Sequence, residues 1–213
     1  SSAASDVYKR QIPRSELDRL TDGSVHQGVA MQIPPYKYPD ATDLVLDTME
    51  RWHSGKLSTP PLFVALDGIT DPRNLGAIIR SVSAFSGDGV IIPERRSAAV
   101  TAGAWKTSAG AAARIPVAMA TNLTRVIQQA KEQGIFVIGL DGGGDIELPA
   151  LELANEPLCV VVGSEGKGLS RLVTENCDQI VSIPIDSAME SLNAAMAVGI
   201  TLYDVSRRRA SAN

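Results

Sequence analysis

Three short segments of the chain carry the side chains that could do chemistry. Residues 71–81 contain Asn74 and Arg80, residues 161–170 hold Glu165 among glycines, and residues 183–195 contain Ser191 and Asn193. Amide, hydroxyl and carboxylate groups orient a substrate through hydrogen bonds, and a guanidinium attracts phosphate. The groups therefore fit a reaction in which positioning of the substrate is the main task.

The familiar nucleotide and metal motifs are not found in these segments. The phosphate-loop pattern G-x-x-x-x-G-K-[ST] is absent, and Arg171 stands where a dinucleotide fingerprint requires glycine. Histidine occurs only at positions 26 and 53, outside the three segments, and the two cysteines have no metal-binding spacing. Histidine base catalysis and a zinc site therefore have little support, although a glycine-rich turn alone is compatible with a tight connection.

Alternating apolar runs and helical patterns indicate the elements that must position these groups. The alternation is typical of a parallel sheet covered by helices. We predict an α/β fold, with a six-stranded, mainly parallel sheet and helices on both faces. Strands are expected near residues 62–66, 90–92, 115–118, 135–140, 158–162 and 180–183, and helices over residues 43–52 and 122–133.

The ends of the expected strands and helices bring the chemical groups together. The loops after residues 162 and 183 follow two strands, so they should face one crevice. Asp71 is a natural N-cap and Pro72 fits the first helical position, which puts Asn74 in the first turn of a helix. Backbone N–H groups point outward at such an end and attract phosphate. Arg80, farther along this helix, could serve the site or pair with a carboxylate such as Asp88.

The three segments together resemble the motifs of the SpoU-type (TrmH-like) branch of the SPOUT methyltransferases. They read, in order, D-P-R-N-L-G-A-I-I-R-S, V-V-G-S-E-G-K-G-L-S and I-P-I-D-S-A-M-E-S-L-N-A-A. The resemblance covers about residues 60–208 and is greatest to enzymes that modify a guanosine of large-subunit ribosomal RNA. It implies methyl transfer from S-adenosylmethionine to a ribose 2′-hydroxyl in RNA, and a deep trefoil knot in the C-terminal part.

The resemblance also implies roles for single residues. The catalytic residues would be Asn74, Arg80, Glu165, Ser191 and Asn193, and the cofactor-binding residues would be Leu140, Gly163, Ile183, Ile185 and Leu192. A free guanidinium has a pKa above about 12 and is a poor base, so an RNA phosphate would have to help the arginine activate the hydroxyl. The resemblance further implies a homodimer formed through the knot region, with RNA crossing both protomers. No metal is expected, given the histidine and cysteine positions.

The charges of the chain are unevenly distributed. The net charge is −4, but residues 61–116 carry six basic and four acidic residues, whereas residues 117–204 carry four basic and twelve acidic ones. An RNA-facing surface would therefore use the first half of the α/β domain and the arginines at positions 207–209. These arginines could equally be a solvated helix C-terminus, where cations complement the helix dipole.

The chain divides into three parts by composition and resemblance. We expect a disordered or extraneous leader over residues 1–11, a remnant of an N-terminal substrate-binding domain plus a linker over residues 12–59, and the SpoU methyltransferase catalytic domain over residues 60–213. In the linker, Tyr36 and Tyr38 could pack on the domain or stack on bases. No apolar run has the length of a membrane span and no hydrophobic signal segment is seen, so we expect a cytoplasmic protein.

Other functions remain open on the sequence alone. Enzymes that modify transfer RNA share these motifs, so a transfer-RNA 2′-O-methyltransferase is an alternative. A non-catalytic RNA-binding protein could keep the same fold. An ordinary nucleotide-binding α/β enzyme is the third possibility.

Overall fold

The structure, a computed structural model, describes residues 9–21, 26–32 and 34–211, which belong to two separate units, Ser1–Tyr36 and Lys37–Asn213. In its described part, the first unit has one short helix, α1 (Arg14–Leu20), none of whose residues is buried. The His26 ring is hydrogen-bonded through Nε2 to Asp18 Oδ1 at 2.8 Å. Of the leader expected over residues 1–11, residues 1–8 lie outside the described part of the chain.

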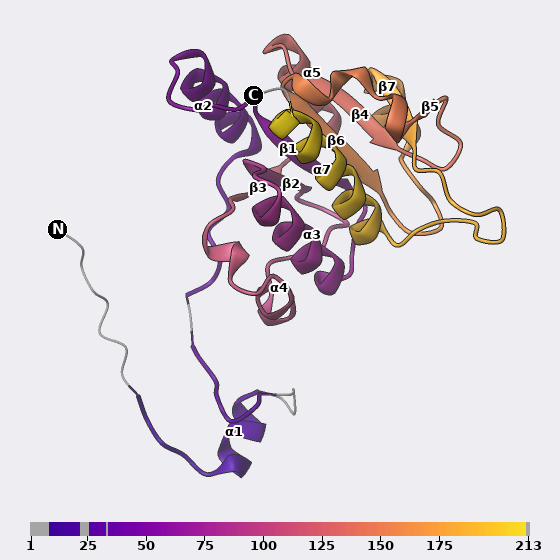
Figure 1. The fold of residues 1–213 in the computed structure, drawn as a ribbon. Helices are drawn as coiled ribbons and strands as arrows, with labels where there is room; N and C mark the ends of the chain where they lie inside the picture. The colour runs from indigo at the N-terminus through magenta and orange to yellow at the C-terminus, as the bar shows by residue number, and fades with distance from the viewer. Residues whose placement is uncertain (1–8, 22–25, 33, 212–213) are drawn as a thin grey trace. The chain divides into compact units, whose positions relative to one another are not determined.

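The second unit is built on one parallel sheet of seven strands (Figure 1). Their order across the sheet is β3-β2-β1-β6-β4-β7-β5, and every neighbouring pair is parallel. The strands are β1 (Leu62–Asp67), β2 (Gly89–Pro93), β3 (Val117–Ala120), β4 (Phe136–Leu140), β5 (Ile146–Glu147), β6 (Leu158–Gly163) and β7 (Gln179–Ser182).

The α/β class and the parallel sheet confirm the prediction, but the predicted count of six strands is wrong. The seventh strand, β5, has only two residues, too few to leave a periodic pattern, and it pairs with β7 at the edge of the sheet. The strand expected at residues 115–118 corresponds to β3, which begins two residues later than predicted. Its pairing with β2 starts at Val117, directly after Pro116. The trefoil knot stays a prediction.

Helices cover both faces of the sheet, as predicted. One layer contains α3 (Pro72–Ala84), α4 (Ala102–Thr107) and α7 (Ala194–Ser211), and Figure 1 shows α7 lying across the sheet beside α3. The other layer contains α2 (Ala41–His53), α5 (Leu123–Glu132) and α6 (Arg171–Asn176). Within the described residues, no helix is both long and apolar enough to cross a membrane.

Alternate side chains of the central strands pack against the two helix layers, one set on each face of the sheet. Every residue of β1 except Asp67, and all of β6, is buried. Phe63, Ala65, Cys159 and Val161 join the α2–α5–α6 core, so the intervening residues of these strands face the α3–α7 layer. Burial raises the pKa of Cys159 to about 12, so its thiol stays protonated and acts as a packing group.

Two helices start at side-chain caps, and the cap at Asp71 is the one that the sequence predicted. Asp71 accepts a hydrogen bond from the Arg73 N–H at 2.8 Å at the start of α3, and Asn122 accepts one from the Arg125 N–H at 3.1 Å at the start of α5. Each cap satisfies an N–H that the helix itself leaves unpaired. The cap of α3 places Asn74 in the first turn, at the carboxyl ends of the strands.

The segment before α2 covers the edge of the sheet at β3. The Val100 N–H donates to Tyr38 Oη at 2.8 Å, and the Met119 N–H donates to the Pro39 carbonyl at 2.9 Å. Asp40 also forms an isolated parallel bridge with Met119. Tyr38 therefore packs on the domain, which is one of the two roles left open for it, and the linker satisfies backbone groups that an edge strand would leave exposed.

The arginines near the C-terminus bind the protein itself. Arg208 pairs with Asp204 at 2.7 Å and donates to the carbonyl oxygens of Leu148, Pro149 and Leu151. Arg209 donates to the carbonyl oxygens of Pro60, Ala154 and Glu156. Burial lowers the pKa of Arg209 to about 10, so the group remains cationic at neutral pH. The predicted RNA-binding role of residues 207–209 is therefore wrong for Arg208 and Arg209.

Replacing Arg209 with alanine is expected to lower the free energy of unfolding by about 2–4 kcal/mol, because the partly buried carbonyl groups of Ala154 and Pro60 lose a charged donor. For a chain of this size the melting temperature should fall by about 5–15 °C in a thermal denaturation experiment. Arg207→Ala is the matched control. The Arg207 side chain is more than half exposed, and among the described residues Asp204 is its one ion-pair partner, so the change should alter stability by less than about 0.5 kcal/mol. Equal melting temperatures for the two variants would contradict the proposed anchoring role.

Candidate functional site

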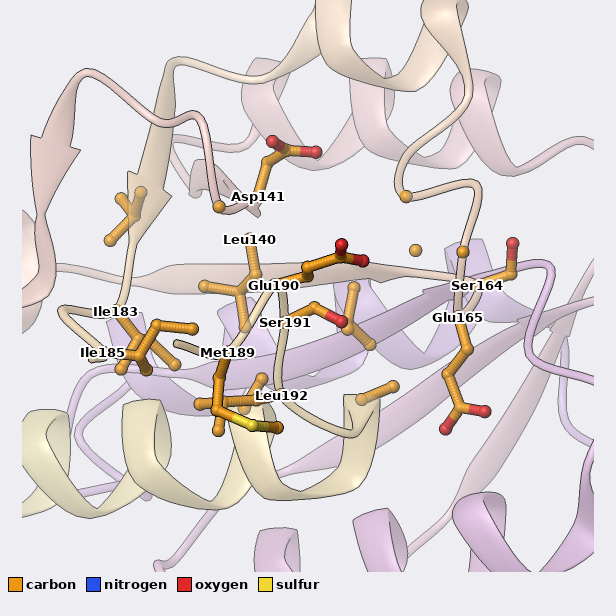
Figure 2. Close-up of a pocket in the computed structure, with 18 of the residues that line it drawn as sticks. Leu140, Asp141, Ser164, Glu165, Ile183, Ile185, Met189, Glu190, Ser191 and Leu192 are labelled. Atoms are coloured by element: carbon orange, nitrogen blue, oxygen red, sulfur yellow. The ribbon is translucent and has the colours of Figure 1, made fainter. Parts of the chain in front are cut away.

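A cavity of about 510 Å³ lies where β4, β6 and β7 end (Figure 2). Its volume is within the usual range for small-molecule sites, and the carboxyl edge of a parallel sheet is where such sites are commonly found. The five residues predicted to bind a cofactor all line this cavity: Leu140, Gly163, Ile183, Ile185 and Leu192. The predicted catalytic residues Glu165 and Ser191 also lie in its wall.

The glycine-rich segment after β6 folds back over the end of that strand. Ser164 and Gly168 form an antiparallel bridge, and Gly168 has a positive φ of 63°. A Cβ atom at Gly163 would lie 2.1 Å from the carbonyl carbon and oxygen of Gly168, closer than any real contact. Glycine at position 163 is therefore required for the backbone to form this wall of the cavity.

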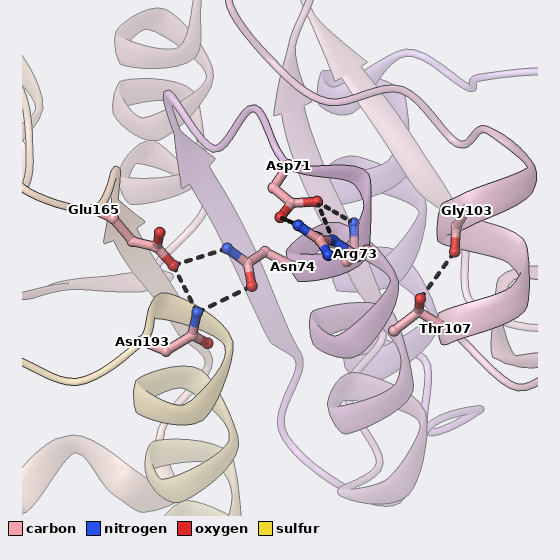
Figure 3. A network of polar contacts seen from close by, with 7 residues as sticks. All are labelled: Asp71, Arg73, Asn74, Gly103, Thr107, Glu165 and Asn193. Atoms are coloured by element: carbon pink, nitrogen blue, oxygen red, sulfur yellow. Dashed lines mark hydrogen bonds and ion pairs between the residues drawn. The ribbon is translucent and has the colours of Figure 1, made fainter.

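Next to the cavity, three polar side chains from distant parts of the sequence meet (Figure 3). Glu165 Oε1 accepts hydrogen bonds from Asn74 Nδ2 at 2.9 Å and from Asn193 Nδ2 at 2.6 Å. Asn193 Nδ2 also lies 3.1 Å from Asn74 Oδ1, to which it donates. The structure therefore brings together one predicted residue from each of the three motif segments.

The orientation of the Asn193 amide is set by the start of α7. Its Oδ1 accepts hydrogen bonds from the N–H groups of Ala195 at 3.0 Å and Met196 at 3.3 Å, as an N-cap does. Because this oxygen faces the helix, the Nδ2 group is directed toward Glu165 and Asn74. One side chain thus both starts the helix and orders the network.

Arg80, which was also predicted to be catalytic, neither lines the cavity nor belongs to the polar network. It is exposed on α3 and, among the described residues, makes no hydrogen bond or ion pair with the network. It does not pair with Asp88, whose Oδ2 accepts the Leu62 N–H at 2.8 Å. Burial raises the pKa of Asp88, and the neighbouring Arg209 and Arg51 oppose that shift. The side chain of Arg80 is accessible to a binding partner.

Asp186 and Glu190 line the cavity but were not named as site residues from the sequence. Both follow β7, and their position after a strand end is the signal that could have identified them. Asp141, in the glycine-rich loop that follows β4, lines the cavity as well. Asp67, at the end of β1, accepts the Ser170 N–H at 2.6 Å and fixes the glycine-rich segment from its other side.

A groove of about 550 Å³ runs between α3 and α7, with Asn74 and Asn193 at one end. Its other residues are mostly apolar, and Met196 and Tyr203 are more than half exposed. The two helices lie close together at Gly199, where a Cβ would be 3.4 Å from Ser81 Oγ, an ordinary contact distance. The network thus lies between the polar cavity and an exposed apolar groove.

Two family models match the chain. Residues 61–203 match the SpoU rRNA Methylase family, and residues 3–39 match the family described as RNA 2′-O ribose methyltransferase substrate binding. The second match includes most of the segment over residues 1–11 that the sequence analysis set aside as a leader. The first spans the sheet, the cavity and the network.

Curated relatives from mycobacteria are more than half identical to the chain. A protein of Mycobacterium avium named "Uncharacterized tRNA/rRNA methyltransferase" is 57% identical over 98% of this chain and 65% of its own length. A Mycobacterium leprae protein named "Uncharacterized tRNA/rRNA methyltransferase ML0324" is 57% identical over 93% of this chain and 62% of its own length. The chain therefore spans somewhat less than two thirds of these relatives.

Solved structures share the fold. The SpoU methyltransferase AviRb from Streptomyces viridochromogenes, in complex with AdoMet, has a TM-score of 0.67 and 29% identity over 73% of this chain and 60% of its own. A putative RNA methyltransferase of the TrmH family from Porphyromonas gingivalis has a TM-score of 0.65 and 32% identity over 70% of this chain and 61% of its own.

Proposed function

Because the chain belongs to the SpoU rRNA methylase family, we propose that it transfers a methyl group from S-adenosylmethionine to a ribose 2′-hydroxyl in RNA, with a guanosine of large-subunit ribosomal RNA as its substrate. The observation that carries this proposal is the meeting of Asn74, Glu165 and Asn193 beside a cavity at the strand ends. The match of residues 3–39 to a model for RNA substrate binding supports an RNA substrate.

The chemistry of the cavity fits the methyl donor. Leu140, Ile183, Ile185 and Leu192 offer apolar contacts of the kind that a purine ring needs, and Gly163 gives a close approach of backbone. The carboxylates in the wall suit the cationic groups of the same molecule. When bound there, the donor would supply an electrophilic methyl group attached to sulfur.

The polar network would position the nucleotide that receives the methyl group. A ribose hydroxyl reacts only when it is aligned with the methyl group and its proton is polarised or removed. Asn74 and Asn193 present amide groups whose orientation is fixed by Glu165 and by the α7 cap. Ser191, in the cavity wall next to the network, can hold the nucleotide or the neighbouring backbone.

Arg80 has the complementary task of binding an RNA phosphate and helping to activate the hydroxyl. It is exposed and free of partners in the network, so it can reach a substrate. Further exposed basic residues follow the same strand edge and the adjoining helix, and they would contact the RNA backbone: Arg73, Arg95, Arg96 and Lys106. Arg208 and Arg209 do not belong to this surface.

A second copy of the chain is the proposed occupant of the groove between α3 and α7. The groove exposes Met196, Ile200 and Tyr203 on one helix, an apolar surface next to the catalytic network. Covering it in a homodimer would remove these side chains from water and bring a second protomer close to the bound RNA. A cytoplasmic location is part of the same proposal.

The proposal predicts that the chain transfers label from methyl-labelled S-adenosylmethionine to unmodified ribosomal RNA. Arg80→Ala should reduce the rate by about 100-fold, because the phosphate contact that orients the hydroxyl is lost. The control is Arg125→Ala, which removes an arginine from the exposed start of α5 on the opposite layer. The assay measures label in separate ribosomal and transfer RNA pools, and ribose methylation is then mapped to a nucleotide.

The outcome separates the alternatives. Label on one ribosomal ribose supports the proposal, whereas label on transfer RNA alone would replace the substrate. Binding of S-adenosylmethionine with no transfer to either pool would support a non-catalytic RNA-binding protein. Binding of ATP or NAD in competition with the methyl donor would favour an ordinary nucleotide-binding enzyme.

A further inference from the structure

The wall of the cavity carries negative charge only. Four carboxylate side chains line it, and none of the lining residues is lysine, arginine or histidine: the acidic residues are Asp141, Glu165, Asp186 and Glu190. Carboxylates that share one cavity repel one another and are stabilised by a cation bound there. The cavity should therefore distinguish ligands by their charge.

Three of these four carboxylates are already engaged by the protein. Glu165 Oε1 accepts from both asparagines of the network. Asp141 Oδ1 accepts the Gly143 N–H at 2.9 Å, and Asp186 Oδ1 accepts the Ala188 N–H at 2.8 Å. Within the part of the chain that the structure describes, Glu190 has no hydrogen bond or ion pair. Figure 2 shows its side chain pointing across the pocket, whereas Glu165 points away toward the network.

The two forms of the methyl donor differ by one positive charge. S-adenosylmethionine has a sulfonium and an ammonium against one carboxylate, so it is a net cation. S-adenosylhomocysteine has a neutral thioether and no net charge, and it has the same ammonium and carboxylate groups as S-adenosylmethionine. Any preference between the two must therefore arise near the sulfur.

We propose that Glu190 is a specificity-determining residue that favours the sulfonium form of the donor over the thioether product. This inference rests on the proposed function and deepens it. Loss of the positive charge during methyl transfer would weaken the attraction to Glu190, so the product would leave more readily than the donor. Glu190 acts by charge and takes no part in proton transfer.

The test compares the affinities of three ligands for the whole chain by isothermal titration calorimetry at low and high salt. The ligands are S-adenosylmethionine, S-adenosylhomocysteine and sinefungin, which carries an ammonium in place of the sulfonium. In Glu190→Gln, we expect about a three- to tenfold loss of affinity for the two charged ligands and no change for the thioether. Salt should weaken the preference of the unmodified chain for the charged ligands.

Glu132→Gln is the matched control, since it removes the same charge from an exposed position on α5 outside the cavity. Equal losses for all three ligands would overturn the inference, because Glu190 would then bind a group that they share. Unchanged affinities in Glu190→Gln would also overturn it. If neither S-adenosylmethionine nor S-adenosylhomocysteine binds the unmodified chain, the proposed function itself fails.

Discussion

Replacing Asn193 with aspartate is expected to reduce methyl transfer by on the order of 100-fold while leaving α7 folded. Aspartate keeps the oxygen that accepts the N–H groups of Ala195 and Met196, and a negative charge is favourable at a helix start. It loses the Nδ2 donor that lies 2.6 Å from Glu165 and places a second carboxylate there. The network then loses the order that positions the ribose. Single-turnover transfer to RNA measures the loss.

The comparison with Asn193→Ala separates the two roles of this side chain. Alanine removes the cap as well, so it should cost about 1 kcal/mol of stability in addition to the loss of transfer. Circular dichroism and thermal denaturation follow the helix, and the transfer assay follows the network. If the aspartate variant transferred methyl groups at the normal rate, the hydrogen bonds to Glu165 and Asn74 would have no part in positioning the substrate.

Replacing Gly163 with alanine is expected to weaken binding of S-adenosylmethionine by at least about tenfold. The added methyl group would lie 2.1 Å from the Gly168 carbonyl group, and the backbone there cannot give way as a flexible side chain can. The segment over residues 164–168 would have to move, which changes one wall of the cavity. Overpacking of this kind costs about 1–3 kcal/mol. Calorimetric titration with S-adenosylmethionine measures the effect.

Gly103→Ala is the control for this change. It adds the same methyl group in α4, where the nearest atoms would be Thr101 Oγ1 at 3.7 Å and Pro72 Cβ at 3.8 Å, an ordinary contact distance. Alanine is also favourable inside a helix. An unfolded Gly163→Ala variant would show itself in the circular dichroism spectrum, and a folded variant with normal affinity would contradict the importance of the close contact.

The sequence predicted the parts of the site whose positions follow from local rules. Asp71 and Pro72 mark the start of α3, so the place of Asn74 follows from helix capping alone. Residues such as Leu140 and Gly163 end buried strands, and parallel strands end at one edge. No local pattern predicts that Asn74 contacts Glu165 and Asn193. The resemblance to the family motifs placed the three residues in one site, and the hydrogen bonds between them are visible only in the structure.

Other features depend on tertiary contacts that leave no periodic signal. Arg209 sits in a run of arginines that suggests a solvated or RNA-binding tail, yet it binds carbonyl groups from residues more than fifty positions away. The strand β5 is defined only by its pairing with β7. Glu190 stands next to Ser191 in the motif, but only the structure shows that it has no hydrogen bond or ion pair among the described residues.

The central pairing of the sheet has a consequence for how the chain folds. β1 pairs with β6 over six residues, from Leu62 with Leu158 to Asp67 with Gly163, and both strands lie in the middle of the sheet. Closing so long a loop costs chain entropy before the contact is gained, and topologies rich in such distant contacts fold slowly. During synthesis, residues 62–120 can form only the β3-β2-β1 side of the sheet, and β4 has no neighbouring strand to pair with until β6 has left the ribosome. The cavity proposed to bind the methyl donor needs the end of β6, so it is among the last parts of the molecule to form.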